Sequence, residues 1–140
     1  LVLVGSGPLV EQIKDQADCL GISQSVRFLG TRSDTASLYR AFDVFCLPSL
    51  YEGLPMVGVE CQASHTPILA SDAVTSETAV TTMMQFESLS SSYIKWAEKL
   101  IELSTKAFAP GDDAGLQVFE INAAARVLLD CYMTYLGSVD

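Results

Sequence analysis

The chain has 140 residues, of which 49% are hydrophobic and 18% are charged. This balance suits one compact globular domain and argues against disorder. The 17 acidic and 8 basic side chains give a formal net charge of −9, so the surface should repel nucleic acid and anionic lipid. No apolar run approaches the ~20 residues of a transmembrane helix, and the apolar first residues lack the basic flank of a signal peptide.

The four cysteines lie far apart, and His65 is the only histidine. A structural zinc site or a Cys/His nucleophile pair is therefore not expected, and no metal or other cofactor is predicted. Three cysteines stand in apolar segments, as small core residues of a reducing cytosol do: Cys46, Cys61 and Cys131. The predicted location is the cytoplasm, with the inner face of the membrane as an option for the longer protein.

Short apolar runs alternate with helical segments in the first half of the chain. The runs that predict strands are Leu1–Val4, Val26–Gly30, Val44–Pro48 and Pro67–Ala70. The helices expected between them are Leu9–Leu20, stopped by Gly21, then Ser33–Phe42 and Pro55–Ser64. This alternation indicates an α/β fold with a Rossmann-like parallel sheet and helices on both faces.

After Asp72 the pattern is looser. Short strands are predicted near Thr78–Val80 and Gln85–Phe86, followed by a helix capped within Ser90–Ser92 and a final helix over Val118–Leu136. Spacing on the first of these helices predicts a buried stripe of Ile94, Ala97, Leu100 and Ile101. Because residue 1 already falls inside a strand, residues 1–140 are interpreted as a fragment of a single domain.

Ligands of open parallel sheets bind beyond the carboxyl ends of the strands. Of the loops expected there, the most informative is Tyr51–Pro55, which joins a buried strand to a helix. A helix start has unpaired N–H groups and about half a positive charge, so it can hold a phosphate without a lysine. The amides expected to surround this helix start are those of Gly53, Leu54, Met56 and Val57. A tight turn with no ligand is the alternative.

Glutamates flank this helix start on both sides. Glu60 falls in the second turn of a helix that is apolar nearly all round, where an unpartnered carboxylate is costly to bury. Because helical side chains tilt toward the N-terminus, Glu60 should point at the phosphate site and accept ribose hydroxyls. Glu52, in the loop, should accept hydroxyls of a second ring, and both carboxylates should open into one cleft. The alternative is a solvated Glu52 and an exposed helix stripe that carries Glu60.

Glu52 and Glu60 match the E-x7-E pattern of the retaining family 4 (group 1) glycosyltransferases. Three further segments agree with that family in order and spacing: residues 3–9 (LVGSGPL), 26–34 (VRFLGTRSD) and 41–55 (AFDVFCLPSLYEGLP). The span Leu1–Leu103 therefore resembles the C-terminal, donor-binding domain of the family, which is one half of a GT-B fold. Residues 118–136 resemble its closing helix.

The resemblance implies a hexosyl-type glycosyltransferase that moves a sugar from a nucleotide-diphosphate sugar, by default a UDP-sugar, to a glycan or lipid-linked acceptor. The segments around Pro67–Asp72 and Thr75–Glu77 resemble most the members that build capsular or exopolysaccharides. It implies that Glu60 binds the ribose and that Glu52 is the catalytic-site glutamate, which contacts the transferred sugar without acting as a nucleophile. The other implied donor-binding residues are the four amide positions named above, Gly30, Thr31 and Arg32 at the base, and Gly5 and Gly7 at the cleft border.

This sequence departs from the family pattern in two ways. His65 stands where members carry a glycine, which suggests a turn of left-handed geometry that histidine tolerates. The family's Arg and Lys for the diphosphate, and the acceptor site, fall upstream of residue 1. The expected partners are therefore the nucleotide-sugar donor and a missing N-terminal domain, and the chain alone should show no transferase turnover.

Three other classes remain as alternatives. A sugar-nucleotide epimerase of the GT-B fold would use the same donor site. An NAD-binding oxidoreductase is suggested by Gly5-Ser6-Gly7, but the third glycine and the later acidic residue of that fingerprint are absent. A receiver-type signalling module would need clustered aspartates after the first strand, where Gly-Ser-Gly stands instead.

Overall fold

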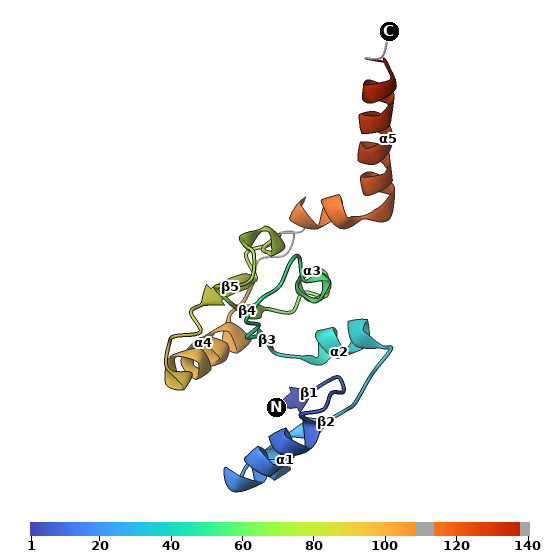
Figure 1. The fold of residues 1–140 in the computed structure, drawn as a ribbon. Coiled ribbons are helices and arrows are strands. Elements are labelled where there is room, and N and C mark those ends of the chain that lie inside the picture. The colour runs from blue at the N-terminus through green and yellow to red at the C-terminus, as the bar shows by residue number, and fades with distance from the viewer. Residues whose placement is uncertain (109–113, 138–140) are drawn as a thin grey trace. The chain divides into compact units, whose positions relative to one another are not determined.

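The computed structural model describes residues 1–108 and 114–137, in which strands and helices alternate along the chain (Figure 1). Contacts between residues divide the chain into two compact units, Leu1–Thr35 and Ala36–Asp140. Among the described residues, no helix has both the length and the apolar character needed to span a membrane. That residues 1–140 form one domain stays a prediction.

The first unit is a two-stranded parallel sheet with one helix. Strand β1 (Val2–Leu3) pairs with β2 (Arg27–Phe28), and α1 (Val10–Cys19) and the 3-10 turn η1 (Ser23–Ser25) connect them. Helix α1 stops at Gly21 as predicted. That glycine has φ +68, and its N–H donates to the Asp18 carbonyl at 2.9 Å. The left-handed conformation explains why glycine is favoured there.

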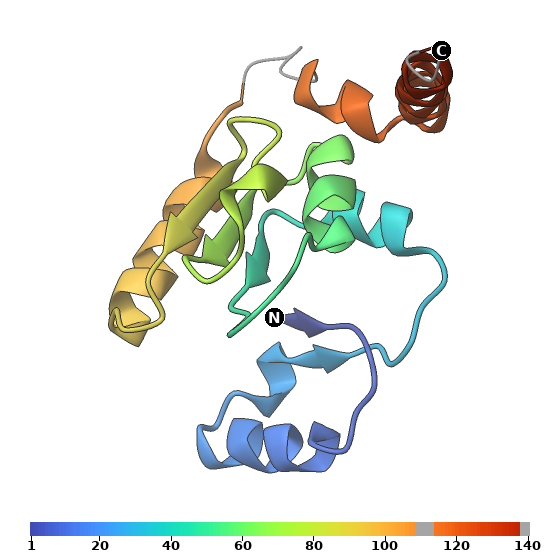
Figure 2. The same cartoon turned by 45° about the horizontal axis from the view of Figure 1, so that its top comes forward.

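The second unit contains a three-stranded parallel sheet in the order β3-β4-β5. Its central strand, β4, is buried at every residue, and helices α3 and α4 lie on opposite sides of it (Figures 1 and 2). The predicted parallel sheet with helices on both faces is therefore confirmed. The elements of this unit are α2 (Thr35–Ala41), β3 (Phe45–Leu47), α3 (Met56–Ala63), β4 (Ile68–Ser71), η2 (Ser76–Thr78), β5 (Met84–Glu87), α4 (Tyr93–Thr105), η3 (Ala114–Phe119) and α5 (Ile121–Gly137).

Two predicted elements differ from the structure. The segment Thr78–Val80 is not a strand, because the Thr75 hydroxyl accepts the Glu77 N–H at 3.4 Å and the chain turns there into η2. The final helix begins at Ile121, with η3 before it, rather than at Val118. The strand predicted around Gln85–Phe86 is confirmed as part of β5.

The core of the second unit forms where β4 meets α2 and α3. Its buried members are Tyr39, Cys61, Ile68, Ala70, Val74 and Met84. Cysteine is therefore a core residue at position 61, whereas Cys46 and Cys131 are exposed and that prediction was wrong for them. Apolar neighbours in sequence do not specify on which face of a strand or helix a cysteine stands.

A buried glutamine joins α3 to the loop between β4 and β5. The Gln62 side chain is fully buried, and its amide nitrogen donates to the Thr78 carbonyl at 2.7 Å and the Gly58 carbonyl at 2.9 Å. Its oxygen accepts from the Thr81 N–H at 3.0 Å and the Thr81 hydroxyl at 2.9 Å. Because each of these groups is buried, the network fixes where α3 lies.

Helix α3 ends in a left-handed turn at His65, where φ is 58. The His65 N–H donates to the Gln62 carbonyl at 2.9 Å, and the Thr66 N–H donates to the Cys61 carbonyl at 3.1 Å. These two bonds make a Schellman motif, in which glycine is the usual residue at the left-handed position. The predicted left-handed turn at His65 is confirmed.

Replacing His65 with glycine should raise the stability of the chain by up to about 1 kcal/mol. The strain of a left-handed non-glycine residue is removed, and the exposed ring makes no hydrogen bond to another of the residues that the structure describes. Urea unfolding followed by circular dichroism measures the change. Loss of stability in this variant would mean that the imidazole contributes a contact worth more than the strain.

Glu87, at the carboxyl end of β5, anchors α4. Its side chain is 3% exposed and pairs with Lys95 at 2.9 Å and Lys99 at 2.7 Å. It also accepts from the Ser91 hydroxyl and the Ser88 N–H. Lys99 first, then Ser91 and Lys95, hold the pKa of Glu87 far below its ordinary value.

With Glu87 paired to Lys95 and Lys99, the side of α4 that packs on the sheet differs from the predicted one. The helix begins after the Ser92 cap, as predicted, and Ser92 accepts the Lys95 N–H at 3.3 Å. However, Ile94 and Ile101 are 70% and 66% exposed, and Ala97 is exposed too. The predicted stripe is wrong except for half-buried Leu100. The residues turned inward are Trp96, Lys99, Leu100 and Leu103.

Replacing Glu87 with glutamine should lower stability at pH 7, and the loss should shrink as the pH falls. The unfolded chain binds a proton at Glu87 below pH ~4.3, whereas the folded carboxylate resists protonation to lower pH. The stability from this depressed pKa is therefore complete above that pH and is lost progressively below it. Urea unfolding at pH 7, 4 and 3 tests this, with Glu98→Gln on the exposed side of α4 as control. A difference that does not change with pH would contradict it.

Candidate functional site

The start of α3 is partly exposed and lacks a side-chain cap: Pro55 is buried, Met56 is exposed and Val57 is half-buried. Pro55 is its N-cap residue, with ψ 106, and within the described chain no side chain donates or accepts a capping bond there. Helix α3 begins with the N–H groups of Met56 and Val57. The positive end of the helix dipole therefore lies at these two amides. Gly53 and Leu54 are exposed just before it. A side-chain carbon added at Gly53 would meet nothing within 4 Å, so a ligand can approach the backbone closely there.

Glu52 is held at the loop before this helix. Ser49 Oγ donates to Glu52 Oε1 at 2.8 Å, and the hydroxyl of Ser71 donates to the Ser49 carbonyl. Ser71 is fully buried at the end of β4. The loop is therefore tied to the carboxyl end of the central strand, and one oxygen of the Glu52 carboxylate has no part in this anchor.

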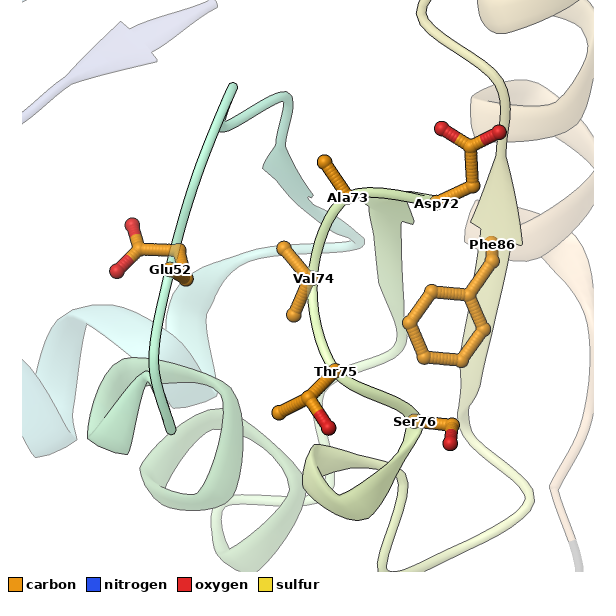
Figure 3. A pocket seen from close by; sticks show the side chains of 7 residues that line it. All are labelled: Glu52, Asp72, Ala73, Val74, Thr75, Ser76 and Phe86. Carbon is orange, nitrogen blue, oxygen red and sulfur yellow. The ribbon is translucent and has the colours of Figure 1, made fainter.

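An open pocket of about 400 Å³ adjoins Glu52 at the carboxyl end of the sheet. Figure 3 shows the Glu52 segment on one side, the turn after β4 on the other, and the Phe86 ring of β5 beside that turn. In this view the Glu52 carboxylate points away from the turn. The pocket is lined by Glu52, Asp72, Ala73, Val74, Thr75, Ser76 and Phe86.

Glu60 lies on the exposed side of α3, together with Met56 and Ala63. The expectation that this helix packs on several sides was wrong, because its buried residues are Gly58, Val59, Cys61 and Gln62. Glu60 lies on an exposed stripe, which was the alternative. Glu60 Oε2 accepts a hydrogen bond from the Tyr39 hydroxyl at 3.1 Å. Glu60 does not line the pocket beside Glu52, so a single cleft for both carboxylates stays a prediction.

In the first unit, the two predicted glycine turns lie against each other. The Gly5 N–H donates to the Gly30 carbonyl at 2.8 Å, and the Ser6 and Thr31 hydroxyls are 3.2 Å apart. Gly5 and Gly30 have φ +126 and +64, which explains glycine at both positions. Gly7 is exposed in the same turn. The two neighbouring turns of the first unit therefore contain Gly5, Gly7, Gly30 and Thr31.

Arg32 is held by a neighbour that sequence reasoning did not connect with it. Its Nε donates to Asp34 Oδ1 at 2.8 Å and its Nη2 donates to Asp34 Oδ2 at 2.7 Å. This two-bond pairing raises the pKa of Arg32 and lowers that of Asp34. The Arg32 charge is already compensated, so the segment can offer a ligand its backbone and the flat guanidinium face rather than a free cation.

The described residues include no cluster of three or more His, Cys, Asp and Glu side chains able to hold a metal. That no metal is needed stays a prediction. The candidate site offers the start of α3 and the carboxylates of Glu52 and Glu60, each of which accepts a hydrogen bond from one protein hydroxyl. It also includes a pocket lined by hydroxyl and apolar groups. Such groups suit a polar ligand that carries phosphate and hydroxyls.

The sequence model of the family described as "Glycosyl transferases group 1" matches residues 1–106 of this chain. The chain belongs to the group 1 glycosyl transferases. The matched span includes both glutamates, the α3 start and the glycine turns of the first unit. It favours neither the epimerase nor the oxidoreductase alternative. The match was expected from E-x7-E and its neighbouring segments, and the resemblance is confirmed.

Two curated relatives of this group 1 chain are named as transferases of sugars. EpsF of Bacillus subtilis (strain 168), a candidate glycosyltransferase by name, is 45% identical over 101 residues, which are 71% of this chain and 26% of that protein. The UDP-Gal:alpha-D-GlcNAc-diphosphoundecaprenol alpha-1,3-galactosyltransferase of Escherichia coli is 37% identical over 73 residues, 51% of this chain and 19% of that protein. The chain thus spans about a quarter of the length of EpsF.

Solved structures agree in fold. The lipopolysaccharide outer core galactosyltransferase WaaB superposes with a TM-score of 0.75 at 16% identity, over 96% of this chain and 40% of that one. Anabaena Alr3699/HepE, solved in complex with UDP, gives a TM-score of 0.66 at 23% identity, over 93% of this chain and 40% of that one. The predicted Rossmann-like half of a GT-B fold is consistent with both.

Sequence reasoning missed the residues that hold the two glutamates. Ser49 and Ser71 fix Glu52, and Tyr39 contacts Glu60 across two helices. The short spacing from Ser49 to Glu52 was a usable signal, since side chains that close in a loop often hydrogen-bond. Tyr39 and Glu60 stand far apart in the sequence, and only the packing of α2 beside α3 brings them together.

Proposed function

We propose that this chain is the donor-binding part of a glycosyltransferase that uses a nucleotide-diphosphate sugar, with UDP as the nucleotide. The observation that carries the proposal is the uncapped, partly exposed start of α3 with Glu52 before it and Glu60 in its second turn. A helix start of this kind attracts the diphosphate, and carboxylates beside it accept sugar hydroxyls. Membership in the group 1 family supports this use of the site.

Each proposed role matches the chemistry of one part of the site. The amides of Met56 and Val57, with Gly53 and Leu54 before them, bind the diphosphate and stabilise charge on the leaving phosphate. Glu60 accepts ribose hydroxyls. Glu52 lies at the edge of the pocket beyond the helix start, and its carboxylate would contact the transferred sugar after turning from its present direction. The enzyme needs no nucleophile from this chain.

The first unit is proposed to recognise the nucleotide base. Its two turns lie together through the Gly5–Gly30 bond, and Gly7 and Thr31 belong to the same turns. The flat face of Arg32 suits stacking on a base, because the Asp34 pair holds the guanidinium in place. This role comes from the family resemblance, and the geometry of the unit is compatible with it.

The identity of the donor and acceptor rests on relatives. HepE was solved in complex with UDP and glucose, and one relative is named for transfer from UDP-Gal to a diphosphoundecaprenol-linked sugar. Another is named as a Vi polysaccharide biosynthesis protein. These names support a UDP-hexose donor and a role in polysaccharide synthesis, with work in the cytoplasm as the proposed setting.

A ligand panel tests the proposal. Ligand-observed NMR and thermal shift with UDP, GDP, ADP and NAD should show selective UDP binding. Glu60→Ala should weaken it by about tenfold or more, since hydrogen bonds to a charged group are lost. Glu98→Ala, on the exposed side of α4, is the control and should keep the affinity. Preference for NAD, or UDP binding unchanged in Glu60→Ala, would contradict the proposal.

A further inference from the structure

Tyr39 is fixed at both ends within the second unit. Its side chain is 7% exposed, and its ring packs edge-on against Phe45 with 5.9 Å between ring centroids. Its carbonyl accepts the Thr66 hydroxyl at 2.6 Å. The ring therefore has one position, and its hydroxyl reaches Glu60 Oε2 at 3.1 Å from a rigid support.

We propose that Tyr39 is a positioning residue for donor binding, whose hydroxyl holds Oε2 of Glu60 so that Oε1 is presented to the ribose diol. The inference rests on the proposed function, since it assigns the ribose to Glu60. An exposed glutamate on a helix surface otherwise samples several rotamers. A ligand that binds only one of them loses affinity, because restricting the side chain lowers its conformational entropy. The tyrosine selects that rotamer before the ligand arrives.

Tyr39 suits this role because its hydroxyl keeps its proton and can donate a hydrogen bond to Glu60. Burial first, and then the hydrogen bond to Glu60, raise the pKa of Tyr39 to about 12. The phenol is therefore protonated at neutral pH. Met56 and Ala63, the exposed neighbours of Glu60 on α3, offer its carboxylate no side-chain hydrogen bond.

Tyr39→Phe tests the inference, because it keeps the buried ring and removes only the hydroxyl. Isothermal titration of the chain with UDP and with 2′,3′-dideoxy-UDP separates ribose recognition from the rest of binding. In Tyr39→Phe the Kd for UDP should rise about three- to tenfold, and the Kd for the dideoxy analogue should stay unchanged. Tyr93→Phe, at a position 94% exposed, should leave both values unchanged.

Glu60→Ala and the double variant complete a cycle. Glu60→Ala should remove the preference for UDP over the dideoxy analogue, and adding Tyr39→Phe should cost nothing further, because the two residues act through one contact. If Tyr39→Phe weakens both ligands equally, or neither, while Glu60→Ala behaves as expected, the positioning role is overturned alone. If Glu60→Ala keeps the preference, or the wild type does not bind UDP, the proposed function fails and this inference with it.

Discussion

Replacing Gln62 with leucine should reduce the free energy of unfolding by about 3 kcal/mol or more. Leucine has a similar volume but neither donates nor accepts. The change leaves the Thr78 carbonyl, the Thr81 N–H and the Thr81 hydroxyl without the partner that they have in the interior. A small domain is stable by only about 5–15 kcal/mol, so the variant should melt at a clearly lower temperature.

Urea unfolding followed by circular dichroism measures this loss. Gln16→Leu, the same change on the exposed side of α1, serves as the control and should shift stability by no more than about 0.5 kcal/mol. A loss below about 1 kcal/mol for Gln62→Leu would mean that water or backbone movement satisfies the freed groups. The assignment of Gln62 as the link between α3 and η2 would then be wrong.

Replacing Met56 with proline should weaken UDP binding by about tenfold or more while the fold persists. Proline is favoured at the first position of a helix, where its missing N–H breaks no helical bond. The extended ψ of 106 at Pro55 is what a residue before proline needs. The substitution therefore removes one amide that we propose binds the diphosphate and changes little else.

Met56→Leu is the matched control, because it keeps the amide and nearly the same apolar volume. It should retain the wild-type Kd for UDP in isothermal titration, and both variants should unfold within about 1 kcal/mol of the wild type. Equal UDP affinity in Met56→Pro and Met56→Leu would show that the amide at position 56 does not contact the ligand. The diphosphate would then have to bind elsewhere than the α3 start.

The alternation of apolar runs with helical segments was enough to predict the parallel sheet of the second unit. Buried parallel strands are continuous in apolar residues, and β4 is buried along its whole length. The left-handed turn at His65 was also predictable, because the position follows a helix and histidine tolerates that geometry. In these places the local pattern and the final packing agree.

Packing between distant segments could not be predicted in the same way. Helix α4 carries apolar residues on more than one side, and periodicity alone does not choose among them. The choice follows from Glu87, whose pairing with Lys95 and Lys99 turns the helix so that Leu103 is buried. In the sequence a serine-rich segment separates Glu87 from the two lysines, and no pattern marks this glutamate as buried.

The two glutamates of the site also show that a sequence pattern does not specify how a side chain packs. Their spacing and residue types predicted that both matter, yet Glu60 lies on an exposed stripe rather than in a buried setting. That stripe arises because α3 is short and packs on one side only. Which hydroxyl restrains each carboxylate depends on rotamers of Ser49 and Tyr39, and no sequence pattern specifies those.

The central claim is that the start of α3 binds the phosphates of the donor. It is tested most directly by comparing backbone amide chemical shifts of the ¹⁵N-labelled chain with UDP and with uridine. We expect UDP to shift the amides of Gly53, Met56 and Val57 most, and uridine to leave these three nearly unchanged. Equal shifts with both ligands, or the largest phosphate-dependent shifts at the start of α1, would contradict the claim.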